Sequence, residues 1–562
     1  MFKINWKKIA SVTVWLLLIL LLFYTRGVNL GWGLPYPMHP DERNMAMAIE
    51  NLNCRLPPTE FNFSTITKCF NPHFFAYGQF NLYLAYLIAL ILKFLDGDFN
   101  TVVSFSEAVV SLRIISFSAS ILNFFVLLKI IELILGKRIR NISQRVFFSL
   151  PLIFIPFFIQ FSHFGTTEAV LMLFYSLIVY LNLKLIQLKK DDFLIKKKRL
   201  ILLIGLMTGL AAATKVSSLI FILPSVISLL DINYYFFKKE KNFLWLKRII
   251  VDCFLLIFLT GFFLVIFSPY NFLAWREFSG AFNYESGVAL GKIDVFYTRQ
   301  FKNTIPIVFQ ITKIFPYVLG WLSIFFYLGF VFLSWRKKEI NFLRWAILAY
   351  FIPNAFLYAK WTRFMAPIFP LMLIIAVIFL QQVKTYFKKN KISHFLFLTF
   401  YLFLLLPGIG YLAVYKGLDS RFQASIWSVK NIPPGSYILS ETANVVDVPF
   451  VLPEKMNFYS NYTYISFNFY DLDLSEEKFS ELKNHLSQAD YIFVPSRRIF
   501  RNHYCQKKNE KISGYFFNHC QYLKKTYPLL NQYYDALFNG RLGFKKVAEF
   551  TSYPKIELFN KK

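Results

Sequence analysis

Long apolar stretches recur along most of the chain and are separated by short polar segments. These stretches are roughly 18 to 25 residues long, which is the length that a helix needs to cross about 30 Å of hydrocarbon. The pattern predicts a polytopic α-helical membrane protein with about eleven spans. The proposed spans are residues 8–26, 108–136, 145–163, 166–187, 199–214, 217–232, 249–270, 309–335, 340–358, 364–383 and 393–415.

Clusters of lysine and arginine indicate how these spans are oriented. They occur at the N-terminus and in the loops at residues 137–145, 184–199, 238–248, 336–338 and 384–391. Because such clusters mark cytoplasmic loops, we predict a cytoplasmic N-terminus and a C-terminus on the outer side. The net charge of +30 is then explained by loops at the lipid surface, and no nucleic-acid partner is expected.

One apolar run, residues 74–95, does not fit this alternation. It carries Gln79 and Asn81 and ends among charged residues. We predict that it is an interfacial or re-entrant helix within a long first outer loop, residues 27–107. The alternative is a twelfth span together with a miscounted span elsewhere.

The composition changes after Lys416, where polar residues and turns replace the apolar runs. Strand-like segments at residues 437–440 and 491–495 flank a helical segment at residues 474–486. This alternation predicts a small α/β domain. The chain is therefore divided into a transmembrane domain, residues 1–416, and an extracytoplasmic domain, residues 417–562, that binds the acceptor or braces the outer loops.

Four of the five cysteines form two local pairs in the predicted outer segments. Cys54 is paired with Cys69, and Cys505 with Cys520, as disulfide candidates, since disulfides form on that side of a membrane. Free thiols are the alternative.

Carboxylates gather on the predicted outer side. Asp41 and Glu42 follow His39 and Pro40 just beyond the first span. A carboxylate within reach of a hydroxyl can act as a general base, and a neighbouring carboxylate can raise its pKa or orient a partner. The same two charges would also favour the N-terminus of a helix. Glu168 supplies a second, separate acidic position.

Basic residues and histidines are predicted near the outer ends of several spans, where they could bind a phosphate. The candidates are His73, Arg113, His163, Lys215, Arg299 and Arg363. An arginine in or near a span is costly unless it meets an anion or reaches the interface. Lys215 and Arg363 rank highest, since a lysine at a break between short spans and a bidentate guanidinium both suit phosphate.

A metal is left open. His163 and Glu168 could both bind a divalent ion, but two ligands do not define a metal site. No cofactor is therefore assigned from the residues themselves.

Five motifs in order resemble a family. They are His39–Glu42, Ser162–Glu168, Gly209–Lys215, Tyr297–Phe301 and Arg363–Pro370. Together they resemble the GT-C glycosyltransferases that use polyprenyl-phosphate sugars, in the superfamily of protein O-mannosyltransferases and aminoarabinose transferases. The resemblance covers most of the membrane part.

This resemblance implies a catalytic Asp41 supported by Glu42, with a second acidic position at Glu168, where family members often carry aspartate. It implies inversion at the sugar carbon, with dolichyl or undecaprenyl phosphate as the leaving group. The expected partners are this lipid-linked donor, membrane lipid, and a hydroxyl acceptor that is a protein, a lipid or a glycan. Metal use varies in the superfamily, so none is inferred.

Two other functions remain as alternatives. A transporter or flippase of lipid-linked substrates would also have spans and charged cavities, but transporters usually consist of two related halves, which this sequence does not show. A non-catalytic scaffold with a working outer domain is the other alternative.

Overall fold

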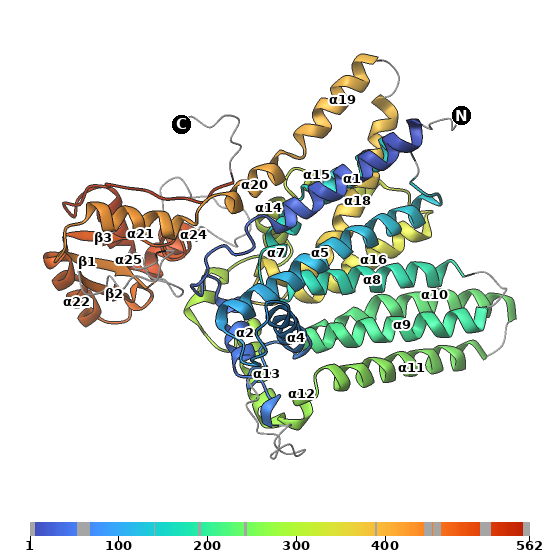
Figure 1. Cartoon of the computed structure of the whole chain (residues 1–562), viewed down its shortest axis with the longest axis horizontal. Helices are drawn as coiled ribbons and strands as arrows, with labels where there is room; N and C mark the ends of the chain where they lie inside the picture. Colours follow the sequence, from blue (N-terminus) through green and yellow to red (C-terminus); the bar gives the residue numbers. More distant parts are fainter. Residues whose placement is uncertain are drawn as a thin grey trace.

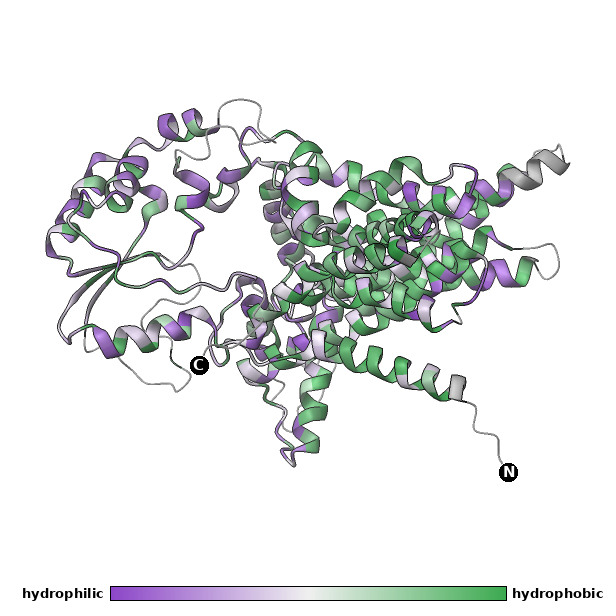
Figure 2. Cartoon of the chain, turned by 90° about the horizontal axis from the view of Figure 1, so that it is seen from above, coloured by the Kyte–Doolittle hydropathy of each residue, from purple (hydrophilic) through white to green (hydrophobic). Residues whose placement is uncertain are grey.

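The computed structural model describes residues 6–52, 68–139, 141–188, 193–240, 244–387, 391–442, 452, 462–505 and 519–554. A helical bundle forms most of the molecule, and a smaller α/β domain lies against one end of it (Figure 1). Apolar residues dominate the bundle, while polar residues are frequent in the smaller domain and at the tips of the bundle helices (Figure 2).

The bundle helices follow the predicted spans closely. They are α1 (Trp6–Gly27), α5 (Phe105–Leu135), α6 (Ile142–Ile153), α7 (Pro156–Ser162), α8 (Glu168–Ile186), α9 (Phe193–Thr214), η2 (Val216–Ile222), α10 (Leu223–Glu240), α11 (Leu244–Phe267), η4 (Gln310–Ile314), α14 (Phe315–Leu319), α15 (Leu322–Phe332), α16 (Lys338–Ala355), α18 (Phe369–Tyr386), α19 (Lys391–Phe403) and α20 (Leu406–Lys416).

The chain is a multi-pass membrane protein. Within the described residues, seven helices are long and apolar enough to cross a membrane, or nine if each of two bent pairs is one span. The pair α6 and α7 bends by 57°, and the segment of η4 and α14 bends by 118° against α15. The predicted spans 199–214 and 340–358 correspond to α9 and α16, which are not among these nine.

Short helices cover the end of the bundle nearest the C-terminal domain (Figure 1). They are α2 (Pro40–Glu50), α4 (Phe80–Leu95), α12 (Tyr270–Leu273), α13 (Trp275–Leu290), η3 (Phe296–Phe301), α17 (Thr362–Met365) and η5 (Ala366–Ile368). Helix α4 packs against α2, α5 and α9.

The predicted helix at residues 74–95 begins later than expected, at Phe80. The cause is a close backbone contact just before it. The Gly78 N–H donates a hydrogen bond of 2.9 Å to the Thr214 carbonyl, and a Cβ at Gly78 would lie 2.0 Å from the Ala213 oxygen. Glycine permits this approach, which holds the segment before α4 against the end of α9.

The C-terminal domain has a three-stranded parallel sheet in its described part, with strand order β2-β1-β3. The strands are β1 (Tyr437–Glu441), β2 (Thr463–Phe467) and β3 (Tyr491–Phe493), and the helical elements are α21 (Ser420–Asn431), η8 (Phe469–Asp471), α22 (Glu476–Gln488), α23 (Phe500–His503), α24 (His519–Thr526) and α25 (Pro528–Phe538). The predicted strand-like segments and helix correspond to β1, β3 and α22, whereas β2 was not singled out.

Three of the four cysteines that were predicted to form disulfides are disulfide-bonded in the structure. Cys505 and Cys520 are joined, with their Cα atoms 5.0 Å apart. Cys69 is also disulfide-bonded. Its predicted partner, Cys54, lies outside the described residues.

Candidate functional site

A cavity of about 1980 Å³ is lined by both parts of the molecule. Helices α2, α7, α8, α13, α15 and α17 contribute side chains, and the C-terminal domain contributes Arg498 and Pro554. A cavity of this size can hold a ligand much larger than a single sugar, because typical small-molecule pockets measure about 300 to 1,000 Å³.

Five charged residues line the cavity close to one another. They are Asp41, Glu168, Lys215, Glu285 and Arg363. The Lys215 ammonium interacts electrostatically with the other four. Arg363 forms an ion pair with Asp41 through Nη1. This polar part of the cavity therefore combines carboxylates and cations from segments that are far apart in the sequence.

Aromatic rings fix the two cations. The Lys215 ammonium lies 5.3 Å from the ring centres of both Tyr77 and Phe364. The Arg363 guanidinium lies 5.0 Å from the ring centre of Trp361. Cation–π contacts of this kind hold a charged head in place without neutralising it. The rings therefore position both cations, and Arg363 is in addition paired with Asp41.

The two carboxyls on the outer helices differ in their tendency to ionise. Burial raises the pKa of the Asp41 carboxyl, but the charges of Arg363, His39 and Lys215 outweigh burial and leave that pKa below its ordinary value. Burial raises the pKa of the Glu285 carboxyl, and nearby Arg363 and Lys215 offset this only in part. The surroundings therefore favour the ionised form of Asp41 and disfavour that of Glu285.

Asp41 lies in the first turn of α2. His39 is the N-cap of this helix, and its Nδ1 accepts a hydrogen bond of 3.4 Å from the Glu42 N–H. Pro40 occupies the first helical position, which suits its missing N–H. The helix N-terminus thus fixes the Asp41 backbone, so the capping role considered from the sequence coexists with a position in the cavity.

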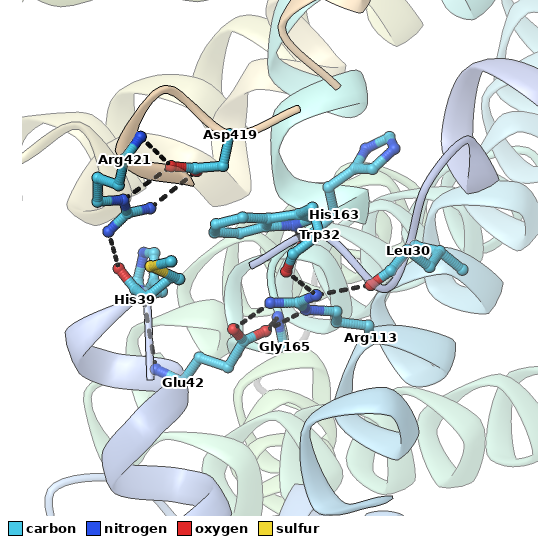
Figure 3. Close-up of polar contacts among 10 residues, drawn as sticks. Leu30, Trp32, His39, Glu42, Arg113, His163, Gly165, Asp419 and Arg421 are labelled. Carbon is cyan, nitrogen blue, oxygen red and sulfur yellow. Dashed lines mark hydrogen bonds and ion pairs between the residues drawn. The ribbon is translucent and has the colours of Figure 1, made fainter. Parts of the chain in front are cut away.

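Glu42 and Arg113 form a buried pair away from the cavity lining (Figure 3). Arg113 donates from Nε and Nη2 to the two Glu42 oxygens, and from Nη1 to the carbonyls of Leu30 and Trp32. The Gly165 N–H also donates to Glu42, at 2.7 Å. Glu42 and two carbonyls contact the Arg113 guanidinium, so the structure does not bring this predicted phosphate ligand to the cavity. Glu42 holds α2 in place and does not face the site.

The C-terminal domain also holds the segment before α2. Arg421, at the start of α21, donates from Nη1 to the Met38 carbonyl at 3.1 Å, and Asp419 pairs with the same guanidinium (Figure 3). Met38 packs against Phe422. The residues leading to Asp41 are thus fixed from the bundle and from the outer domain.

Glu168 and His163 are close in the sequence but have different surroundings. Glu168 begins α8, is buried, and lines the cavity. The ring nitrogens of His163 lie 2.6 Å from the Ile159 carbonyl and 2.9 Å from the Val28 carbonyl, and its ring stacks on Tyr415. Both ring nitrogens of His163 face backbone carbonyls and the ring does not line the cavity, so the structure does not bring this predicted ligand to Glu168.

His73 and Arg299 lie outside the cavity lining. His73 Nδ1 is 2.8 Å from a carboxylate oxygen of Glu277 on α13. Arg299 Nε is 3.5 Å from Asp294. Of the six predicted phosphate ligands, the structure therefore brings Lys215 and Arg363 to the cavity and places the other four elsewhere.

Sequence reasoning missed several lining residues. Tyr297 was identified only as part of a motif, and Glu285 and Trp361 were not among the predicted site residues. Arg498 comes from the C-terminal domain, which was expected to bind the acceptor or brace the outer loops but had no named site residue. Trp361 lies two residues before Arg363, and this proximity was a usable signal. Arg498 carries no such signal in the sequence.

No metal site is seen among the described residues, where no group of three His, Cys, Asp or Glu side chains is placed to hold an ion. The arrangement of carboxylates and cations nevertheless offers acid–base chemistry and anion binding.

The cavity continues into an apolar groove. Its walls come from the bend between α14 and α15, from α7 and from α20, and they include Tyr317, Trp321, Ile324, Phe161 and Tyr411. Tyr317 is 70% exposed and Ile324 is 56% exposed. Since these side chains lie on apolar helices of the bundle, this part of the cavity, the apolar groove, has an apolar wall.

Comparisons with known proteins give the following. No protein-family model matches the chain, and no curated protein matches it. The chain is similar to the crystal structure of the Archaeoglobus fulgidus oligosaccharyltransferase tethered with an acceptor peptide, at 14% identity over 78% of this chain and 62% of that chain, with a TM-score of 0.45. It is also similar to the crystal structure of ArnT from Cupriavidus metallidurans bound to undecaprenyl phosphate, at 12% identity over 84% of this chain and 90% of that chain, with a TM-score of 0.48.

Proposed function

We propose that this protein is a membrane glycosyltransferase that moves a sugar from a polyprenyl-phosphate donor to an acceptor hydroxyl on the outer face of the membrane. The observation that carries the proposal is the meeting, in one cavity, of Asp41, Arg363 and Lys215 with an apolar groove. A lipid-linked sugar phosphate has the matching parts, namely an apolar chain, an anionic phosphate and a sugar.

Asp41 is the general base in this proposal. Its carboxylate accepts the proton of the acceptor hydroxyl as the oxygen attacks the anomeric carbon. The bond from that carbon to the phosphate oxygen breaks, and polyprenyl phosphate leaves with the electron pair. Attack from the face opposite the leaving group inverts the sugar carbon. A positioned base of this kind contributes about 10²- to 10⁴-fold in rate.

Lys215 and Arg363 stabilise the departing phosphate, because both are cations held by rings in the same part of the cavity. Without donor, Arg363 is paired with Asp41. A donor phosphate would compete for that guanidinium, so donor binding would loosen its pairing with Asp41 and make the carboxylate a stronger base. The pair thus links donor binding to activation of the base.

The groove at the α14–α15 bend accommodates the polyprenyl chain. Aromatic and aliphatic walls remove the chain from water, with a gain of about 25 cal/mol for each Å² of apolar surface buried. Glu168 and Glu285 are placed to accept hydrogen bonds from sugar hydroxyls, because both line the cavity near Lys215.

The proposed orientation has the N-terminus in the cytoplasm and the C-terminal domain outside. The C-terminal end of α8 and the N-terminal ends of α9 and α11 lie at the end of the bundle away from the C-terminal domain (Figure 1). These helix ends carry basic residues, namely Lys184, residues 196–199, Lys247 and Arg248. Basic loops favour the cytoplasmic side, which supports placing the cavity and the domain on the outer side.

The test is sugar transfer in lipid nanodiscs with labelled polyprenyl-phosphate sugars. The wild type is expected to release or transfer label, and Asp41→Asn to be slower by at least about 10²-fold. Asp294→Asn is the matched control, since Asp294 is an outer carboxylate that does not line the cavity. Well-folded Asp41→Asn protein with wild-type turnover would refute Asp41 as the base. Donor binding by both proteins without turnover would favour the transporter or scaffold alternatives.

A further inference from the structure

Arg498 brings the C-terminal domain into the cavity. It follows strand β3, near the carboxyl end of the parallel sheet, and its side chain is half-buried and lines the cavity. In α/β sheets, ligands bind beyond the carboxyl ends of parallel strands, where the strand order reverses. In this sheet β1 lies between β2 and β3. The chain therefore adds β2 on one side of β1 and β3 on the other side, and the strand order reverses at β1.

Two neighbouring rings of η3 hold the Arg498 guanidinium. Its central carbon lies 5.8 Å from the ring centre of Phe296 and 6.0 Å from that of Tyr297. Phe296 packs on Tyr470 of the C-terminal domain, with ring centres 4.3 Å apart, and Tyr297 lines the cavity. The head of Arg498 is therefore placed by rings that belong partly to the domain and partly to the cavity wall.

Arg498 differs from several paired arginines of the molecule in its charge environment. Arg113, Arg363, Arg421 and Arg541 each pair with a carboxylate. Across the described part of the chain, no carboxylate oxygen lies within the 4.0 Å ion-pair distance of the Arg498 guanidinium. A fixed guanidinium that faces a cavity and lacks a carboxylate partner there is suited to bind an anion from outside the chain.

This anion differs from the donor phosphate. The cations that act most strongly on Asp41 are Arg363, His39 and Lys215, and Arg498 is not among them. Arg498 acts instead on Tyr470 and His503 of the C-terminal domain. Its ligand would therefore lie on the domain side of the cavity, at a distance from the reacting carboxylate.

We propose that Arg498 binds an anionic group, a phosphate or a carboxylate, that the acceptor carries away from its reacting hydroxyl, so that the C-terminal domain selects anionic acceptors. This inference rests on the proposed transferase function. It assigns Arg498 to acceptor specificity, while base catalysis and donor binding belong to other residues.

Acceptor kinetics give the first test. The probes are methyl α-glucoside, its 6-phosphate and methyl α-glucuronide, with the same labelled donor. The wild type is expected to show a KM about 10- to 100-fold lower for the two anionic probes, as expected for one charge-assisted hydrogen-bonded pair. The phosphate and the glucuronide, compared with each other, identify which anion is preferred.

Arg498→Gln should raise the KM for the anionic probes toward that of the neutral glucoside, and it should change the KM for the neutral glucoside much less. Arg498→Lys should retain part of the preference, because it keeps the charge and loses the planar fork. Arg497→Gln is the matched control, since the neighbouring Arg497 stacks on Tyr553 at 3.9 Å and does not line the cavity. Equal loss with neutral and anionic probes in Arg498→Gln, or no anion preference in the wild type, would overturn the inference.

A binding test separates this inference from the proposed function. Phenylglyoxal labels arginines, and peptide mass spectrometry reports Arg497 and Arg498 separately. Methyl α-glucoside 6-phosphate or methyl α-glucuronide should slow the labelling of Arg498 relative to Arg497, and methyl α-glucoside should not. Protection without any turnover would retain the anion site and refute the transferase. Turnover without protection by either anion would retain the transferase and refute the anion site.

Discussion

Arg113 and Glu42 are joined at two points, with distances of 2.7 Å from Nε to Oε1 and from Nη2 to Oε2. Their side chains are 1% and 3% exposed. The pair connects α5 with α2, and through the Gly165 N–H it also connects with the segment before α8. Since α2 carries Asp41 and α8 begins with Glu168, one buried pair fixes the two carboxylates on which the cavity depends.

Glu42→Gln is expected to destabilise the protein by about 3 to 5 kcal/mol, because it leaves the buried Arg113 guanidinium without a counter-charge. Transfer should fall as well, because α2 is no longer fixed. Thermal unfolding in nanodiscs measures the first effect. Glu481→Gln, which breaks the exposed pair with Lys478, serves as the control and should change stability by less than about 1 kcal/mol. A Glu42→Gln protein as stable as the wild type would contradict this prediction.

Arg363→Gln is expected to shift the acid limb of kcat/KM toward neutral pH. The Arg363 charge helps to lower the pKa of the Asp41 carboxyl, so its removal lets that pKa rise and the base becomes protonated at higher pH. Transfer assays across the acid range measure the shift. Arg363→Lys keeps the charge and should stay closer to the wild-type profile, and an unmoved limb in Arg363→Gln would show that Asp41 is not the titrating base.

Gly78→Ala is expected to impair donor use and stability together. The added Cβ would lie 2.0 Å from the Ala213 oxygen, so the segment with Tyr77 must separate from the end of α9, next to Lys215. Overpacking of this kind costs about 1 to 3 kcal/mol. Donor KM and thermal unfolding report the two effects. In the control, Gly280→Ala on α13, a Cβ would meet nothing within 4 Å, and helix stability should be unchanged or slightly improved.

Glu441→Gln is expected to stabilise the C-terminal domain at alkaline pH. Burial raises the pKa of the Glu441 carboxyl from 4.5 to about 8, although the Tyr534 hydroxyl donates to it at 2.6 Å. Between these two pH values the folded domain keeps a proton that the unfolded chain has released. The free energy of unfolding therefore decreases as pH rises through this window, by up to several kcal/mol at about 1.4 kcal/mol for each tenfold change in proton affinity.

Limited proteolysis of the full-length protein, compared between wild type and Glu441→Gln at each pH, measures this effect. Resistance of the domain in the wild type should fall from pH 5 to pH 9 relative to the variant. Parallel curves for the two proteins would show that Glu441 ionises in the folded domain as freely as in the unfolded chain.

The bundle could be predicted from the sequence because the bilayer imposes a minimum apolar length on each span. Strands β1 and β3 and helix α22 were also predictable, since short apolar runs and a helical period appear locally. The start of α4 was not, because the contact of Gly78 with Thr214 joins residues that are distant in the sequence. Local patterns carry no information about such contacts.

Cavity residues could be predicted from the sequence where a charged side chain had few possible partners other than a ligand. Lys215 and Arg363 lie at the ends of apolar segments, and both line the cavity. Arg113 was a lower-ranked candidate, and its guanidinium is paired with Glu42, which lies 71 residues away in the sequence. Arg498 was missed because the fold alone brings the loop after β3 to the bundle.

Phe296 and Tyr297 are adjacent in the sequence but contribute to different parts of the molecule. Phe296 packs into the core of the C-terminal domain, while Tyr297 lines the cavity between the two parts. A chimera that joins residues 1–416 to the outer domain of a relative would therefore place a foreign surface on Phe296. A domain exchange in this architecture has to include η3 together with residues 417–562. The exchangeable unit thus consists of two segments that are separate in the gene.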